Sequence, residues 1–387
     1  MYQSRKSYCK WLSSTRTSLS SLPVLQFPKM SHQMLRIIDA NCNRIGEGLR
    51  FLEEVARFIL DDASLSKKLK AIRHSVVKSI SKLGVKLISE RDSESDVGAK
   101  VKSPGKQQDL PSLITANAKR VEEGLRVIEE LSKVPELSLV LNSLHFQQAR
   151  FQLYTLEKNL LSRILRQQKI TRLSGLYVIL DTQVLGTRDA VEAAAQIIHG
   201  GARVIQLRDK RSEKGELLAT ARKLKDVCCQ TDTLFIVNDH LDIALAADAD
   251  GLHIGQEDLP LTIARKELPI DKIIGCSTTT LKQALKAQTE GADYIAVGAM
   301  FSTPTKEEAT VVGVKRLQQM KQKISVPIVA IGGINRDNVT EVVAAGADAM
   351  AVISAVLHQD DIEKATRQMV SKIEQKRKNN GKSGKNR

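Results

Sequence analysis

Eight short apolar runs alternate with helix-like segments through the second half of the chain, and this alternation constrains the fold most strongly. The segments between the runs have helical periodicity, and Gly200, Gly291 and Gly346 stand where helix ends favour glycine. Eight β/α units in about 200 residues predict a TIM barrel. A doubly wound sheet is the alternative, but the even spacing leaves no switch point. The runs are residues 176–180, 203–207, 234–238, 251–255, 272–276, 294–298, 327–331 and 349–353.

The first half of the chain has a different pattern. Residues 35–170 are helical in periodicity throughout, and the polar stretch 166–172 joins them to the second half. We therefore predict an α/β protein in which a helical repeat domain at 34–170 precedes a barrel domain at 171–372. A basic, Ser-rich extension at 1–33 and a basic tail at 373–387 are both expected to be disordered.

The basic charge is concentrated at the two ends of the chain. The net charge is +15, residues 1–33 carry five Lys or Arg and no acid, and residues 371–387 carry seven Lys or Arg and one Glu. Only +4 remains for the residues between, since 15 − 5 − 6 = 4. Aromatic residues make up 3% of the chain, too few for recognition by stacking on bases. We expect no nucleic-acid partner.

Cysteine usage and hydropathy indicate a protein of a reducing compartment. The five cysteines form no C-x-x-C pair, so neither a disulfide framework nor a zinc site fits. No stretch of 18 apolar residues exists, so we expect no membrane partner. We expect a cytoplasmic protein, in which residues 1–33 are an extension left by a mis-assigned start. The alternative is that residues 1–33 are an organellar transit peptide. The sequence does not decide whether the protein is a monomer or a homo-oligomer.

The helical half contains an internal repeat. Residues 40–54 recur as residues 116–130, and nine of the fifteen positions are identical. One interpretation is structural, with ion pairs along the helix and a glycine where two helices cross. The other is a small-molecule pocket at the pseudo-dyad of a bundle. Its candidate residues are Asn41, Arg44, Glu47 and Arg50 with their counterparts Asn117, Arg120, Glu123 and Arg126.

Polar residues follow the predicted strands of the barrel, where TIM-barrel active sites lie. Asp239 and Asp258 follow neighbouring strands and can hold Mg²⁺ together with phosphate oxygens. The cations Arg208, Lys210 and Lys306 can neutralise a diphosphate. The rim therefore predicts a metal-bound diphosphate site.

A second anion site is predicted after the last two strands. Gly332-Gly333 and Ser354 occupy the usual phosphate position of the fold, where backbone N–H groups face the ligand. Two facing phosphorylated substrates indicate transfer of a group from one to the other with loss of diphosphate. A TIM-barrel isomerase or aldolase is the rival enzyme, and a ligand-binding regulator is the rival of another class.

The motifs QLRDK, ND, HIGQED, GCST, FSTPTK, AIGG and VIS together resemble the thiamine-phosphate synthase family over about residues 174–357. The resemblance implies a transferase of thiamine biosynthesis, which couples hydroxymethylpyrimidine diphosphate to thiazole phosphate with Mg²⁺ and releases diphosphate. Thr279 stands where the family often has a histidine, a departure that we expect to be tolerated.

The resemblance also assigns roles to individual residues. Ser277 and Lys306 are the expected catalytic residues, and Asp239 and Asp258 are the expected Mg²⁺ ligands. The expected pyrimidine diphosphate residues are Gln206, Leu207, Arg208, Asp209, Lys210, Asn238, Ser277 and Lys306. The expected thiazole phosphate residues are Thr303, Pro304, Thr305, Gly333, Ile353 and Ser354.

The repeat domain resembles the domain fused to this synthase in some bacteria. That resemblance implies a multifunctional chain whose helical domain is a hydroxymethylpyrimidine-phosphate kinase using ATP. The polar segment 91–100 between the repeat copies is either an acidic metal loop, with Asp92 or Asp96 as the candidate Mg²⁺ ligand of such a kinase, or a surface connection. No Walker A motif is present to support a kinase. A non-catalytic assembly module is the alternative for this domain.

Overall fold

A computed structural model describes residues 31–91, 108–302 and 311–383, with side chains as far as residue 380. They form two compact units, which we treat separately. One contains residues up to Glu53, those from Ser66 to Gln107 and those from Ala116 to Leu153, and the other contains the rest. This division does not follow the linear boundary at residue 170, which stays a prediction.

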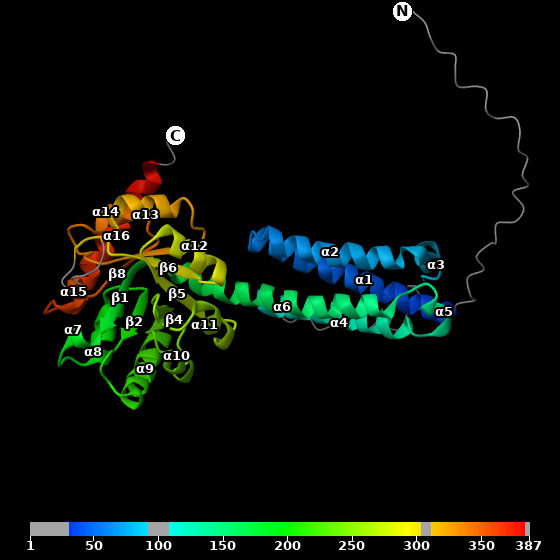
Figure 1. The fold of residues 1–387 in the computed structure, drawn as a ribbon, viewed down its shortest axis with the longest axis horizontal. Coiled ribbons are helices and arrows are strands. Elements are labelled where there is room, and N and C mark those ends of the chain that lie inside the picture. Colours follow the sequence, from blue (N-terminus) through cyan, green and yellow to red (C-terminus); the bar gives the residue numbers. More distant parts are fainter. Residues whose placement is uncertain (1–30, 92–107, 303–310, 384–387) are drawn as a thin grey trace, which may run out of the picture. The chain divides into compact units, whose positions relative to one another are not determined.

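Eight parallel strands in the described part close into a barrel, in which each strand pairs with the next and β1 pairs with β8 (Figure 1). The predicted TIM-barrel class is confirmed. The strands are β1 (Gly175–Asp181), β2 (Val204–Arg208), β3 (Leu234–Asn238), β4 (Gly251–Ile254), β5 (Ile273–Thr278), β6 (Tyr294–Val297), β7 (Ile328–Ile331) and β8 (Ala349–Val352).

Helices follow the strands and cover the outside of the barrel (Figure 1). They are α7 (Thr182–Leu185), α8 (Ala190–His199), α9 (Lys214–Cys229), α10 (Leu241–Ala246), α11 (Leu261–Glu267), α12 (Leu281–Glu290), α13 (Gly313–Lys321), α14 (Val339–Ala344), α15 (Ser354–Leu357) and α16 (Ile362–Ser383).

Two apolar layers explain why the strands read as continuous apolar runs. Tyr177 and Ile179 of β1 belong to the cluster inside the barrel, whereas Val178 and Leu180 belong to the layer between strands and helices. Successive side chains point to opposite faces of a strand, and both faces of a barrel strand are covered. The site is therefore carried by the polar residues at the strand ends.

The first half of the chain is helical, as its periodicity predicts. A π-helical turn at Val55–Ile59 follows α1, and a 3₁₀ turn at Ser81–Leu83 follows α2. The helices are α1 (His32–Glu54), α2 (Ala63–Ile80), α3 (Gly84–Ser89), α4 (Leu110–Leu131), α5 (Pro135–Ser138) and α6 (Ser143–Arg172).

The two repeat copies lie on α1 and α4, which cross at a pair of glycines. A Cβ on Gly48 would lie 2.5 Å from Val121 Cγ2, and one on Gly124 would lie 2.9 Å from Ile45 Cγ1. These contacts are reciprocal, since each glycine meets the apolar residue of the other copy. The duplicated glycines therefore permit the close helix crossing that the structural interpretation predicts.

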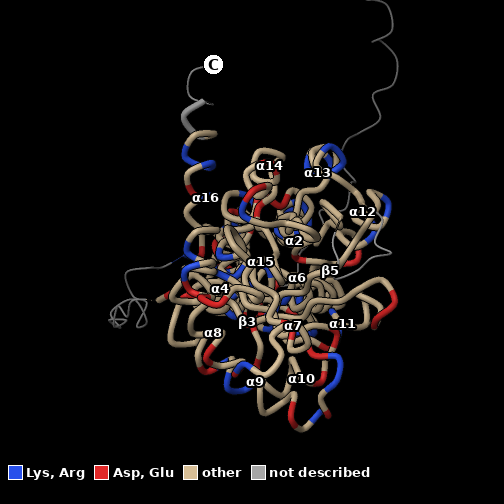
Figure 2. Tube along the Cα trace, turned by 90° about the vertical axis from the view of Figure 1, so that its left-hand side faces the viewer, with Lys and Arg blue, Asp and Glu red and all other residues tan. Residues whose placement is uncertain are grey.

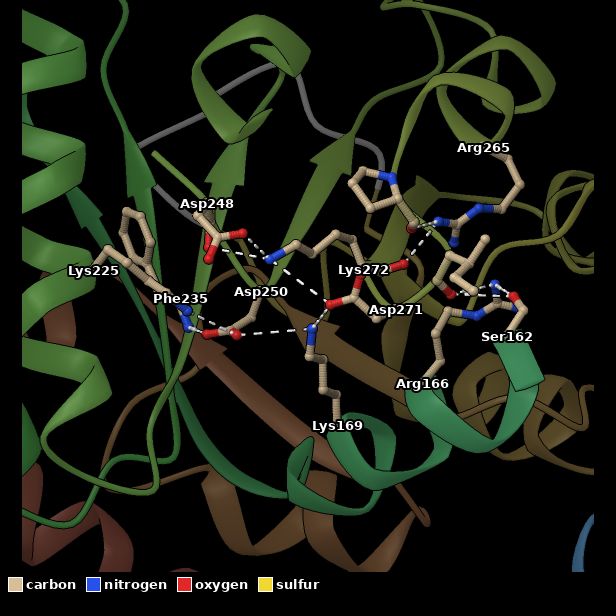
Figure 3. A network of polar contacts seen from close by, with 12 residues as sticks. Ser162, Arg166, Lys169, Lys225, Phe235, Asp248, Asp250, Arg265, Asp271 and Lys272 are labelled. Atoms are coloured by element: carbon tan, nitrogen blue, oxygen red, sulfur yellow. Dashed lines mark hydrogen bonds and ion pairs between the residues drawn. The ribbon is translucent and has the colours of Figure 1, made fainter. Parts of the chain in front are cut away.

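The stretch 166–172 is the last part of α6 and not a loop. Arg166 Nε lies 2.8 Å from Asp293 Oδ1, and Lys169 Nζ lies 2.9 Å from Asp271 Oδ2. Ser162 Oγ donates to the Ile270 carbonyl at 3.1 Å (Figure 3). The polar residues that suggested a linker are thus the contacts by which α6 is held against the barrel strands and loops.

The basic tail also differs from its prediction. The disorder predicted for 373–387 is wrong as far as Ser383, because α16 continues to that residue. Ile373 is buried and helps to anchor the helix, whose last turns carry Lys and Arg (Figure 2). Of the extension at 1–33, residues 1–30 lie outside the described part. In the described helices no segment is long and apolar enough to cross a membrane.

Candidate active site

Three charged residues meet at the ends of β2, β3 and β4. Lys210 follows β2, and its Nζ pairs with Oδ2 of Asp239, which follows β3. Asp239 in turn shares a side-chain hydrogen bond with Asp258, from the loop after β4. The Gly255 N–H donates to Asp258 Oδ2 at 2.7 Å and fixes that carboxylate. The structure thus brings together the two predicted metal ligands and one predicted diphosphate cation.

Asp239 is held in an unusual conformation. Its φ is 60°, a left-handed value that is uncommon for residues other than glycine, although aspartate adopts it more often than most. Its N–H donates to the His253 carbonyl at 2.8 Å, which ties it to β4. Such strain persists only where the surroundings impose it, and it is concentrated at functional sites.

The two carboxyls titrate in opposite directions. Burial, with the adjacent Asp258 carboxylate, raises the pKa of Asp239. Burial acts on Asp258 too, but the hydrogen bonds from Gly255 and Asp239 prevail and lower the pKa of Asp258. The pair therefore holds a proton between them more readily than two separate aspartates would.

This donor set fits Mg²⁺. Two adjacent carboxylates repel each other, and a divalent cation between them removes that repulsion. Mg²⁺ usually takes one or two carboxylates and completes its shell with phosphates and waters. Among the described residues no group of three or more His, Cys, Asp or Glu could hold a metal ion, so this pair would need oxygens from a substrate.

Arg208 ends β2 and is oriented by a residue that the sequence analysis missed. Its Nη1 pairs with Oδ2 of Asp181, which ends the neighbouring strand β1 and is buried. Asp181 also accepts from the Gln183 N–H at 2.9 Å and so caps α7. A carboxylate at the end of the LYVILD run was the available signal.

The remaining residues expected at the pyrimidine diphosphate differ in position. Gln206 is buried inside the barrel, and Asn238 ends β3 opposite His253. Leu207 packs between strands and helices, so only its main chain could face a ligand. Asp209 accepts from the Arg211 and Ser212 N–H groups at 2.9 and 3.0 Å, which shapes the loop after β2. Their substrate roles stay predictions.

Ser277 is the end of a buried polar chain. Its Oγ lies 2.9 Å from His253 Nε2, and His253 Nδ1 lies 3.0 Å from the Tyr294 hydroxyl. Tyr294 contacts the Tyr177 hydroxyl, to which Gln206 donates. Burial lowers the pKa of His253 to about 4. The sequence analysis missed the two tyrosines and the histidine, because nothing in their spacing shows that their three strands bring these side chains together.

The expected thiazole phosphate residues are described only in part. Gly333 follows β7 with a φ of +65°, and a Cβ there would lie 2.6 Å from the Ser302 carbonyl oxygen. Ile353 and Ser354 follow β8, and α15 begins at Ser354. Thr303, Pro304, Thr305 and Lys306 lie outside the described residues. Thr279 donates to Gln283 Oε1 at 3.0 Å at the start of α12.

A cavity lies in the helical unit, between the repeat copies. Its volume is about 340 Å³, and both copies contribute the same residue types. Asn41 is buried and donates to the Ile37 carbonyl, whereas both arginines and both glutamates are exposed. The lining is Asn41, Arg44, Glu47 and Gly48 from α1, and Asn117, Arg120, Glu123 and Gly124 from α4.

Some duplicated polar residues have structural partners instead. Arg126 pairs with Glu129 and Glu130 at 2.8 and 2.7 Å, and neither Arg126 nor Arg50 lines the cavity. Glu129 also pairs with Arg150, just as Glu53 pairs with Arg73. The polar residues that are identical in the two copies therefore serve two purposes: some form ion pairs, and others line the cavity. Asp92 and Asp96 lie outside the described residues.

Comparison with known proteins accounts for both halves. A family model described as thiamine monophosphate synthase matches residues 176–356, and one described as the ThiD2 family matches residues 36–159. A thiamine-phosphate synthase of Thermosynechococcus vestitus is 39% identical over 89% of this chain and 96% of its own. A thiamine-phosphate synthase of Synechocystis is also 39% identical, over 87% of this chain and 96% of its own.

A solved structure supports the barrel. The thiamine phosphate pyrophosphorylase of Pyrococcus furiosus is 38% identical, with a TM-score of 0.50, over 54% of this chain and 98% of its own. The closed barrel and the matching family model define a TIM-barrel transferase. The chain belongs to the thiamine-phosphate synthase family, and its helical half matches the ThiD2 family.

Proposed function

We propose that the barrel joins hydroxymethylpyrimidine diphosphate to thiazole phosphate and releases diphosphate. The observation that carries this proposal is the contact of Lys210, Asp239 and Asp258 at three adjacent strand ends. Two carboxylates and a cation suit a metal diphosphate better than a sugar phosphate alone. An isomerase or aldolase would require a base or an imine-forming lysine instead.

In this proposal the reaction breaks one C–O bond and forms one C–N bond. The diphosphate leaves the methylene carbon of the pyrimidine with the bonding electron pair, and the lone pair of the thiazole nitrogen forms the new bond. That nitrogen carries no proton, so no general base is required. Mg²⁺, when bound, stabilises negative charge on the diphosphate.

The protein's part is to bind and orient the two substrates. Lys210 and Arg208 donate to phosphate oxygens, and Asp181 keeps the Arg208 guanidinium aligned. Asp239 and Asp258 hold the metal. Positioning two reactants in this way can supply roughly 7–11 kcal/mol of the barrier in favourable cases.

The test is the full-length chain with both phosphorylated substrates and Mg²⁺. We expect chromatography to show thiamine phosphate and diphosphate in equal amounts, with loss of product when a chelator removes Mg²⁺. Binding of both substrates without product would overturn the proposal in favour of a ligand-binding regulator.

We propose further that the helical unit makes the diphosphate substrate. In this step the γ-phosphoryl group of ATP moves to a phosphate oxygen of hydroxymethylpyrimidine phosphate, and ADP leaves. The observation that supports it is the cavity with one exposed arginine from each repeat copy, Arg44 and Arg120. Paired guanidinium groups suit phosphate oxygens.

The kinase proposal is tested in the full-length chain with ATP, Mg²⁺, the pyrimidine monophosphate and thiazole phosphate. We expect Arg44→Ala and Arg120→Ala to abolish product from the monophosphate but not from the diphosphate. Lys119→Ala is the matched control, because Lys119 is an exposed cation of α4 outside the cavity lining. If the chain binds neither ATP nor the monophosphate by calorimetry, the helical unit is an assembly module.

A further inference from the structure

A chain of five polar side chains crosses the inside of the barrel. Gln206 Nε2 donates to the Tyr177 hydroxyl at 2.6 Å, and the two tyrosine hydroxyls lie 3.2 Å apart. Tyr294 OH lies 3.0 Å from His253 Nδ1, and His253 Nε2 lies 2.9 Å from Ser277 Oγ. The residues come from β1, β2, β4, β5 and β6. All except Ser277 are buried.

The directions of these hydrogen bonds are linked. Tyr177 accepts the Gln206 amide hydrogen, so its own hydrogen is available to the neighbouring Tyr294 hydroxyl. Buried hydroxyl hydrogens find acceptors, and the acceptor that remains for Tyr294 is His253 Nδ1. An Nδ1 that accepts leaves the ring hydrogen of a neutral histidine on Nε2.

We propose that this chain makes His253 a positioning residue, whose Nε2–H donates to Ser277 so that the serine hydroxyl donates outward to the substrate. Ser277 Oγ accepts one hydrogen from His253, and its own hydrogen turns toward the mouth of the barrel. An anionic diphosphate needs donors, so a serine held in this direction suits it better than one that donates inward to a histidine.

A stack of two rings lies beside the serine. His253 and Tyr294 rings stack with centroids 5.5 Å apart and an interplanar angle of 27°. The stack restrains the imidazole while the two hydrogen bonds fix which nitrogen faces Ser277. This inference rests on the proposed role of Ser277 at the diphosphate, but the tautomer of His253 can be measured without any substrate.

The first experiment measures the tautomer in the full-length chain labelled with ¹⁵N-histidine and free of substrate. Loss of one signal set in His253→Gln assigns the resonances of His253. We expect long-range ¹H–¹⁵N correlations of the Nε2–H form. The Nδ1–H form would overturn the proposal, because Nε2 would then accept from Ser277. This result stands whether or not the proposed synthase activity is found.

The second experiment is a double-mutant cycle on KM for the pyrimidine diphosphate. We expect Ser277→Ala to raise KM about tenfold to a hundredfold, the range for one hydrogen bond to a charged group. His253→Met should raise KM by a similar factor and add nothing in the Ser277→Ala background. His253→Gln, which keeps an N–H donor, should restore most of the loss. Factors that multiply in the double variant would indicate a merely structural histidine and overturn the proposal.

Discussion

Asp239 and Asp258 share a hydrogen bond although they belong to loops that follow different strands, and burial shifts the pKa of Asp239 upward while that of Asp258 moves downward. A cation that binds to the two carboxyls would therefore displace the proton that they hold. The N–H of Gly255 holds Asp258 ionised, and the strained backbone of Asp239 presents the second carboxyl beside it.

Mg²⁺ affinity should therefore depend on pH. The raised pKa of Asp239 means that this carboxyl binds a proton at a higher pH than an ordinary aspartate, whose pKa is about 3.9. Metal binding must expel that proton, so affinity is highest above the Asp239 pKa and falls as pH decreases through it. Calorimetry in buffers of different ionisation enthalpy should detect proton release in mildly acid solution. Affinity that is constant from about pH 8 to about pH 4 would contradict this.

The phosphate of the second substrate should depend on Ser354. The Ser354 side chain follows β8, where backbone and hydroxyl donors can face a phosphate. We expect Ser354→Ala to raise KM for thiazole phosphate by about tenfold, the effect of one hydrogen bond to a charged group, and to leave KM for the pyrimidine diphosphate unchanged. Steady-state kinetics with each substrate varied in turn measures both. Equal effects on the two KM values would argue against this assignment.

The buried ion pairs of the repeat should carry stability and not ligand binding. Glu53 pairs with Arg73 and Glu129 pairs with Arg150, at 2.9 and 3.0 Å. We expect Arg73→Met to destabilise the helical unit by about 3 kcal/mol, because the buried Glu53 carboxylate loses an ion-pair partner. Arg150→Met should cost less, about 2 kcal/mol, because Glu129 keeps its pair with Arg126. Thermal or urea unfolding measures the loss, and Arg44→Ala serves as the comparison. Unchanged stability in both Met variants would show that these pairs are dispensable.

The end of α6 should stabilise the barrel. Asp293 is buried and pairs with Arg166 and Arg265, and burial raises the pKa of this carboxyl despite both cations. We expect Arg166→Met to lower the free energy of unfolding by about 2 kcal/mol. The loss is smaller than for a buried ion pair whose only cation is removed, because Arg265 still pairs with Asp293. Arg172→Met is the control on the same helix, since Arg172 pairs with the exposed Asp232 and should contribute less than about 1 kcal/mol.

That contact also bears on truncated chains. A fragment that starts at residue 170 lacks Ser162, Arg166 and Lys169, all of which contact barrel residues (Figure 3). We expect it to unfold at a lower temperature than one that starts at residue 154, where the last segment of the barrel-containing unit begins. Equal melting temperatures would mean that the α6 contacts contribute little.

The strands could be predicted because buried parallel strands are continuous apolar runs. The runs 234–238 and 349–353 match β3 and β8 to within a residue at either end. The end of α6 could not be predicted, because Arg166 and Lys169 look solvated in sequence and are ion-paired only through tertiary contacts. The basic tail misled in the same way, since Ile373 is buried.

The site was predictable where one strand end carries one charge. Asp239, Asp258 and Lys210 each follow a strand, and a barrel gathers strand ends at one rim. The interior chain through His253 and Tyr294 was not predictable, because it depends on which strand residues point inward and on register across the barrel. The cavity residues followed from duplication, but sequence identity did not separate Arg44 from Arg50, of which only Arg44 lines the cavity.

The most direct test of the account compares turnover of Asp239→Asn and Asp242→Asn in the full-length chain with both phosphorylated substrates and Mg²⁺. Each substitution removes one carboxylate that pairs with a lysine, but the Lys214–Asp242 pair is exposed and joins α9 to α10. We predict that Asp239→Asn forms thiamine phosphate at least a hundredfold more slowly, about 2.7 kcal/mol in the barrier, while Asp242→Asn is close to wild type. Near-normal turnover by a folded Asp239→Asn variant would contradict the metal diphosphate site.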